Sequence, residues 1–388
     1  MTNSSLNISN IVWQAVKGLI YLLLIFGYSF TKINVVGSVY LYDLILLLLF
    51  VFSLIKLDKI KGEKELLIFI VIGFIYLAFS LYLGDGLIYV IRQYMIVGYF
   101  TLIFFIFQKI RNKTDKIIAF LLRISKVAFI LQLVYLIFIL LSGKTLFSDF
   151  NYLSPVAVIL IPVYTARVLV YDKKGIVKVL KILLILGTST MLGHSSAFLA
   201  VVVTIFGFFV LKISPKQFLA AFLLVVIAII LLYFLLPQFR DVNANWRLFY
   251  WGIGLRNTFD TFLFLGNGFG APFITSEQIQ EMINIFGGSN DFLGSMEERY
   301  FKAFHNSFIT IIFHMGVFTL LLTKPYRQGI KRLIFGEKSK ELNFLIISLL
   351  GISIWVAFNV ILELPHSSLL FWLVFLLTSN ELKRSHAA

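Results

Sequence analysis

The chain has 388 residues, of which 60% are hydrophobic and 14% charged, and its mean hydropathy is +0.94. A soluble core cannot hide so much apolar side chain, so a soluble globular protein is excluded and lipid is the expected solvent for most of the chain. The net charge of +15 comes from short Lys and Arg clusters between apolar runs, which argues against a nucleic-acid partner. The absence of cysteine excludes disulfides and thiolate metal sites.

Apolar runs of about 20 residues, long enough to cross a hydrocarbon core of roughly 30 Å as helices, recur along the whole chain. They predict an all-α polytopic membrane protein with twelve transmembrane helices, and not a β-barrel, whose strands would be short and alternating. The first run lacks a basic start and a small-residue cleavage site, so we expect it to be retained as a helix. The predicted helices are 11–30, 36–55, 66–83, 87–107, 118–141, 156–171, 178–192, 196–212, 218–236, 305–323, 342–362 and 366–380.

The connections between these helices alternate between basic and nearly neutral. Because Lys and Arg accumulate on the cytoplasmic side, this alternation predicts that both termini are cytoplasmic. Residues 1–388 are then a single integral membrane domain with an even number of spans. The basic connections are 56–64, 109–116, 173–181, 212–216, 324–340 and the tail after 380.

One connection, 237–304, is far longer than the others. It holds five basic and seven acidic residues, a net charge of −2, and both its composition and the helix count place it on the periplasmic side. Within it, Trp246 to Leu265 predicts an amphipathic helix lying on the membrane surface, and Ser276 to Phe286 predicts a second helix with Ser276 as its cap. Between them, Gly266, Gly268 and Gly270 break the helix, and because no strand precedes them we do not expect a nucleotide site.

Arginines at or near this outer face are the first candidate functional residues. Arg92 lies about five residues, or roughly 7.5 Å, into its predicted helix, where a charge is costly and a phosphate or a cavity is the expected partner. Arg247 begins the predicted loop helix beside Trp246 and is the preferred anion binder, with a lipid-headgroup anchor as its alternative role. Arg256 lies nine residues further on, on a largely different face of the helix.

Histidines and carboxylates near the same face supply candidates for proton transfer. His305 opens a predicted helix at the end of the loop, where a general acid or base would meet a ligand at the headgroup plane; its alternative role is helix capping. His314, deeper in that helix, is expected to be packed between helices. No zinc-hydrolase spacing occurs, so we expect neither a metal nor any other cofactor. Further candidates are His194, Asp291, Glu298, Glu363 and His366.

Three segments in this order carry a family resemblance: 245–251 (NWRLFYW), 265–270 (LGNGFG) and 305–307 (HNS), with Gly316 further along. Together with the helix count and the single large loop, they resemble the Wzy-type O-antigen polymerase and O-antigen ligase superfamily. Many relatives carry Ser-Arg where this chain has residues 193–196 (GHSS), which weakens an assignment to the ligase branch.

The resemblance implies a metal-independent, inverting glycosyltransferase of GT-C type in the bacterial inner membrane, acting on undecaprenyl-diphosphate-linked oligosaccharide. It implies that Arg247 and, less directly, Arg92 and Arg256 bind the diphosphate, and that His305 is the catalytic histidine. A repeat-unit polymerase is the first hypothesis, with membrane lipid and a chain-length regulator protein as further partners. The alternatives are an O-antigen ligase acting on lipid A core, a flippase or transporter, and a scaffold within an export complex.

Overall fold

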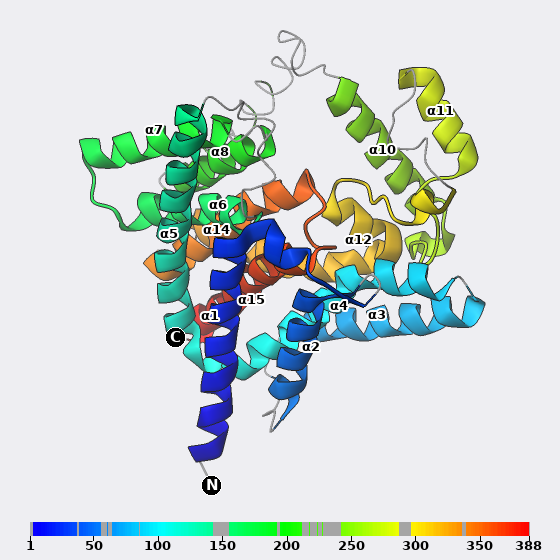
Figure 1. Ribbon diagram of the computed structural model, residues 1–388, viewed down its shortest axis with the longest axis horizontal. Coiled ribbons are helices and arrows are strands. Elements are labelled where there is room, and N and C mark those ends of the chain that lie inside the picture. Colours follow the sequence, from blue (N-terminus) through cyan, green and yellow to red (C-terminus); the bar gives the residue numbers. More distant parts are fainter. Residues whose placement is uncertain are drawn as a thin grey trace.

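The structure, a computed structural model, consists almost entirely of helices (Figure 1). The only strands among the described residues are β1 (Asn34–Val36) and β2 (Val39–Tyr40), which pair antiparallel. The described residues are 3–36, 39–55, 60, 64–84, 86–142, 155–191, 195–211, 217, 223, 227, 242–286, 296–335 and 339–387.

Helices of the first part of the chain follow the apolar runs closely, and α3, α4, α6, α7 and α8 agree with prediction to within three residues. Two differences occur near the N-terminus. The first helix begins at Asn3, well before the apolar run, and the second begins only at Leu41 because the β1–β2 pair occupies the preceding residues. The helices are α1 Asn3–Thr31, α2 Leu41–Leu54, α3 Lys64–Leu83, α4 Leu87–Ile110, the 3₁₀ turn η1 Arg111–Lys113, α5 Thr114–Leu141, α6 Pro155–Tyr171, α7 Ile176–Met191 and α8 Ser195–Val210.

The second part of the chain departs further from prediction. The helix expected at 218–236 falls almost wholly outside the described residues and stays a prediction. The helix expected over 305–323 is broken at Gly316, and an additional helix occupies the connection that follows it. The elements are α10 Val242–Phe259, η4 Phe262–Phe264, α11 Ser276–Phe286, η5 Met296–Tyr300, α12 Ser307–Met315, η6 Gly316–Thr323, α13 Lys324–Phe335, α14 Lys340–Ala357 and α15 Pro365–Ala387.

Several helices have the length and composition of membrane spans. Five helical segments of the described chain are long and apolar enough to cross a bilayer, and the longest of them joins α4 and α5. The side of α3 turned away from the protein exposes Ile68, Val71, Phe74, Ile75 and Phe79. An apolar face of that extent suits lipid and not water. The five segments are Ile8–Gly27, Lys64–Leu83, Leu87–Phe138, Ser307–Phe335 and Lys340–Ala357.

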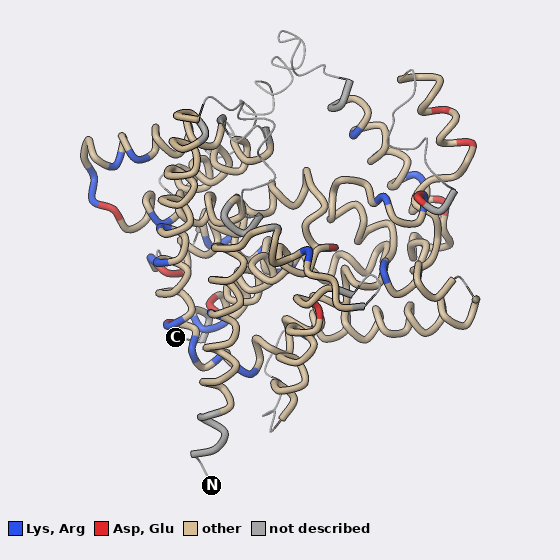
Figure 2. Tube along the Cα trace, in the orientation of Figure 1, with Lys and Arg blue, Asp and Glu red and all other residues tan. Residues whose placement is uncertain are grey.

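The main core lies where α4, α6, α14 and α15 meet, and it is dominated by aromatic side chains. Trp372 of α15 is buried against Phe100 of α4, with ring centroids 4.6 Å apart. Charged residues are sparse along these central helices (Figure 2).

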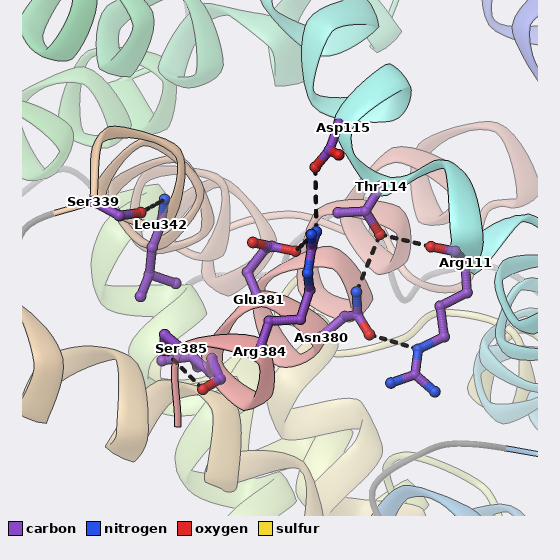
Figure 3. A network of polar contacts seen from close by, with 10 residues as sticks. Arg111, Thr114, Asp115, Ser339, Leu342, Asn380, Glu381, Arg384 and Ser385 are labelled. Carbon is purple, nitrogen blue, oxygen red and sulfur yellow. Dashed lines mark hydrogen bonds and ion pairs between the residues drawn. The ribbon is translucent and has the colours of Figure 1, made fainter. Parts of the chain in front are cut away.

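At the end of α15, polar contacts fasten this core to the η1 turn (Figure 3). Arg111 Nε donates to Asn380 Oδ1 at 2.6 Å, and Asn380 Nδ2 donates to Thr114 Oγ1 at 3.1 Å. Arg384 pairs with Asp115 and Glu381 at 3.2 and 2.8 Å. Asn380 and its partner Thr114 are buried, and their bond fixes α15 against the start of α5.

A second, smaller core forms beneath α10 and corrects the prediction that the apolar face of this helix is turned to the membrane surface. Trp246, Tyr250 and Ile253 of α10 are buried against Phe304 and Phe313, so these side chains pack on the protein beside α12. The helix also ends at Phe259, six residues before the predicted Leu265. Exposed aromatic side chains occur at its last residue, Phe259, and in the following η4 turn, at Phe262 and Phe264. Figure 1 shows α10 and α11 side by side next to α12.

The predicted helix Ser276–Phe286 is confirmed as α11, but its cap is Thr275 and not Ser276. The Gln278 N–H donates to Thr275 Oγ1 at 3.2 Å, and the Thr275 N–H donates to Gln278 Oε1 at 3.0 Å. This reciprocal pair is a capping box. Ser276 instead accepts a hydrogen bond from Arg299 at 2.9 Å, which ties α11 to η5.

Candidate functional site at the α10–α12 junction

Arg247 lies in the second turn of α10, next to the buried Trp246. Its guanidinium is partly buried, and Nη1 donates to the backbone oxygen of Phe358 at 3.4 Å. Phe358 directly follows α14, so the loop arginine reaches the turn that joins α14 to α15. A single long hydrogen bond leaves most of the five guanidinium donors available for an anion.

His305 lies two residues before α12 and does not cap it. The cap is Asn306, whose side chain accepts from the N–H groups of Phe308 and Ile309 at 3.1 Å each. His305 itself has a φ of +50°, uncommon for a residue with a side chain, and its ring meets Trp246 edge-on at 5.8 Å. Positive φ outside glycine costs of order 1–3 kcal/mol, and such strain is often found at functional positions.

Glu363 reaches the same place from the turn between α14 and α15. Its Oε2 accepts a short hydrogen bond from Ser307 Oγ, and Ser307 Oγ in turn accepts from the N–H groups of Ile361 and Leu362 at 2.9 and 3.1 Å. Burial raises the pKa of the Glu363 carboxyl, and the hydrogen bonds that favour its charged form, led by that of Ser307, offset the shift only in part. The start of α12 is thereby fixed to the turn.

These contacts bring three of the predicted candidates to one junction. We define the α10–α12 junction as Arg247, His305, Ser307, Glu363 and the Phe358 carbonyl. Trp251 adds a further tie, since its Nε1–H donates to the Phe304 oxygen at 2.8 Å while its ring lies 5.4 Å from that of Phe358. The junction thus offers a cation that can bind an anion, together with an imidazole and a carboxyl that can accept or donate a proton. A transfer reaction without a metal requires groups of these kinds.

Arg92 and Glu298 belong to a different neighbourhood. The Arg92 guanidinium lies 4.5 Å from the centre of the Phe301 ring, and Tyr89, one turn earlier, stacks on Tyr300 at 4.5 Å. Glu298 pairs with Lys302 at 2.9 Å. Arg92 and Arg247 thus contact different parts of the described chain, the Phe301 ring and the Phe358 oxygen.

The remaining candidates have varied surroundings. Arg256 is exposed in the last turn of α10. His366 is buried in the first turn of α15, close in sequence to Glu363. His194 and Asp291 lie outside the described residues. Within the described part of the chain, no three side chains of His, Asp and Glu come together as metal ligands would.

The glycine-rich segment 266–270 is hydrogen-bonded to other parts of the protein and does not form an anion-binding loop. We call it the glycine-rich latch. Its consecutive N–H groups all donate to protein oxygens: Gly266 to Thr261 Oγ1, Asn267 and Gly268 to the Phe313 and His314 carbonyls, Phe269 to Ser80 Oγ, and Gly270 to Gln93 Oε1, at 2.6 to 3.1 Å. With every amide donor engaged, the segment cannot cradle a phosphate as a phosphate loop does.

His314 completes this latch, as expected for a packed histidine. It is fully buried, its Nδ1 lies 2.6 Å from the Gly268 oxygen, and the rings of Phe269, Phe273 and Phe313 surround it. The segment is therefore held between α12 and the α3–α4 pair.

No role was assigned from the sequence to two polar residues that assemble the site, Ser307 and Asn359, or to Gln93, which holds the glycine-rich latch. Ser307 and Asn359 fasten the α14–α15 turn, since Asn359 Nδ2 donates to Ser196 Oγ at 3.1 Å while Ser307 holds the turn from α12. Gln93 binds both Gly270 and Ala271. Polarity inside apolar segments is a signal that could identify Gln93 and Ser307, because polar side chains in such segments hydrogen-bond to neighbouring helices.

Comparisons of the chain with protein-family models, curated proteins and solved structures give no match.

Proposed function

We propose that the chain is a polysaccharide repeat-unit polymerase of the bacterial inner membrane. It transfers a growing glycan from undecaprenyl diphosphate to the non-reducing end of a lipid-linked repeat unit at the periplasmic face. The proposal includes the twelve-span, GT-C-like topology with cytoplasmic termini, and a chain-length regulator protein as a partner. The sequence resemblance and the charge pattern support it.

The observation that carries the proposal is the set of contacts at the α10–α12 junction. Arg247 bonds to the α14–α15 turn, Ser307 of α12 bonds to Glu363 of the same turn, and the His305 ring lies against Trp246, the neighbour of Arg247. Departure of a diphosphate without a metal needs a fixed cation close to the phosphates, and arginine keeps its charge at every accessible pH. The Phe358 carbonyl and the packed α10 hold Arg247 in a defined position, so little reorganisation is needed as charge develops.

In the proposed reaction, a hydroxyl oxygen of the acceptor sugar forms a bond to the anomeric carbon of the donor as the bond from that carbon to the diphosphate oxygen breaks. The electron pair leaves with the diphosphate, which Arg247 stabilises. The hydroxyl proton passes to a base, and the anomeric configuration inverts. His305 is the proposed base, with the Glu363 carboxylate as the competing acceptor at the same junction.

Purified protein incubated with radiolabelled undecaprenyl-diphosphate-linked repeat units tests the proposal, with the products separated as a ladder on a gel. Arg247→Ala should lower the rate by about 100- to 1000-fold, the usual cost of removing one charge-stabilising donor. Arg247→Lys should recover part of it. Arg123→Ala is the matched control, because Arg123 is an exposed arginine on α5 and its loss should leave the rate unchanged.

A normal ladder from correctly inserted Arg247→Ala protein would refute the mechanism. Transfer that occurs only when lipid A core is supplied would identify a ligase instead. Movement of the lipid-linked unit across a bilayer without any new glycosidic bond would identify a transporter.

A further inference from the structure

The basic connection after the broken helix α12–η6 contains a helix that the sequence reading missed. α13 covers Lys324–Phe335, and it buries Pro325, Gly329 and Leu333, a stripe with a period of four residues, against α14 and α15. Tyr326 extends this contact, since its hydroxyl lies 2.8 Å from Ser353 Oγ of α14. α13 is therefore a packed part of the fold.

The opposite stripe of α13 is exposed and mixes cations with apolar side chains. Arg327 and Lys331 alternate with Ile330 and Phe335, which are 39% and 68% exposed. These four residues lie on one face, because Ile330 and Lys331 follow Arg327 by three and four positions and Phe335 follows Lys331 by four. We call them the α13 face.

Two observations place this face at a bilayer boundary. α13 is the last part of the candidate span Ser307–Phe335, after the apolar η6, and it is followed by α14, which is itself long and apolar enough to cross a membrane. Its own composition, with four basic residues and no acidic one, is unsuited to the hydrocarbon interior. A short helix of this kind between two spans is expected to lie in the interface, with apolar side chains reaching the acyl boundary and cations at the headgroups.

The cations of α13 divide into two pairs. Lys324 bonds to Glu65 at 2.8 Å and Arg332 donates to the Ser385 oxygen at 3.0 Å, so both fasten the helix to its neighbours. Arg327 and Lys331 make no ion pair within the described chain and point away from the packed stripe. The exposed pair is therefore positioned for an anion outside the protein.

We propose that the α13 face binds the phosphodiester headgroup of an anionic phospholipid, with Arg327 and Lys331 on the phosphate and Ile330 and Phe335 beside the acyl chains. The charge of the pair complements such a headgroup, and the exposed apolar residues match the boundary below it. The site is independent of the proposed glycan transfer.

A local fluorescence measurement tests the site in the intact protein. Because the chain has no cysteine, Gln328→Cys introduces a single label next to the α13 face. The labelled protein is reconstituted in vesicles of phosphatidylglycerol and phosphatidylcholine, with a nitroxide quencher carried by one lipid or the other. Phosphatidylglycerol should quench several-fold more strongly than phosphatidylcholine at equal content.

Removing the two charges should abolish that preference. A Lys or Arg near an anionic surface is worth about a fivefold preference, so Arg327→Gln with Lys331→Gln should bring the several-fold quenching ratio down to about one. Arg327→Lys with Lys331→Arg should preserve it and shows that the fold tolerates change there. Lys173→Gln with Lys174→Gln removes the same charge from the exposed connection between α6 and α7 and should leave the ratio unchanged.

Equal quenching by both lipids in the unsubstituted background would overturn the proposal. So would an absence of quenching by either lipid, which would mean that water or a second protein surface covers the face. A loss of preference in the Lys173 and Lys174 control as large as in the test variant would show a general effect of net charge and would equally refute a site at α13.

Discussion

Replacing Gly316 with alanine perturbs the place where the glycine-rich latch meets α12. Gly316 ends α12 with φ +51° and ψ −132°, a conformation that side chains disfavour. An added Cβ would lie 2.0 Å from the Phe264 oxygen and 2.4 Å from the Leu265 carbonyl carbon. Both neighbours are backbone atoms, so no side chain can rotate away to relieve the overlap.

Two contributions set the expected loss of stability. The backbone conformation costs of order 1–3 kcal/mol in a residue other than glycine. To relieve the overlap, the two backbone segments must also move apart, until the distance between the added Cβ and the Phe264 oxygen rises from 2.0 Å to the 3.4 Å at which ordinary contact begins. That movement breaks the bonds from Asn267 and Gly268 to α12, each worth about 1 kcal/mol net. The free energy of unfolding should fall by roughly 3–5 kcal/mol in total.

Thermal unfolding of the detergent-purified protein measures this loss as a lower midpoint. Gly18→Ala and Gly187→Ala are matched controls, since an added Cβ at either helical glycine meets nothing within 4 Å. Helix propensity predicts that each control gains about 0.5–1 kcal/mol, so test and control should move in opposite directions. An unchanged or raised midpoint for Gly316→Ala would refute the latch geometry.

Three further changes give separate tests. With His305 as the proposed base, Glu363→Gln should leave the pH profile of transfer unchanged. Loss of the acid limb in this variant would instead make Glu363 the proton acceptor, because its raised carboxyl pKa moves formation of the carboxylate to a higher pH than in an ordinary glutamate. Gln93→Leu should lower the thermal midpoint, because it leaves the Gly270 N–H without its acceptor and so reduces the free energy of unfolding by about 1–3 kcal/mol. Asn380→Leu should also lower the midpoint by removing the bonds to Arg111 and Thr114, whereas exposed Asn112→Leu should change it little; equal effects would contradict the network.

The apolar runs predicted most helices because their length and continuity are set by local composition. Predictions of this kind succeed for α3 and α11, whose limits coincide with the ends of apolar or amphipathic periodicity. They fail where tertiary contacts decide the outcome. The break at Gly316 depends on the latch packing against it, and α13 is stabilised by its contact with α14 and α15 although its sequence is strongly basic.

The candidate site could be predicted only residue by residue. Charge and position identified Arg247, His305 and Glu363 separately, but their meeting depends on Ser307, whose hydroxyl bonds across more than fifty residues to the α14–α15 turn. Serine is common in apolar helices, so its type alone does not reveal such a role. The same limit explains why Arg92 was grouped with Arg247: proximity to one membrane face is visible in the sequence, whereas position within that face is not.

The correction to α10 strengthens the case for Arg247. A helix lying on the bilayer surface would leave its arginine free to follow the lipids, and a mobile cation must be reordered during each reaction. In the structure the same helix is fixed by Trp251 to the residue before His305, and Tyr250 donates to the Lys302 oxygen at 2.6 Å. Fixed donors stabilise developing charge without reorganising. The aromatic residues that first suggested a lipid-facing helix thus act by holding Arg247 and His305 in one rigid unit, which is the arrangement that the proposed loss of diphosphate requires.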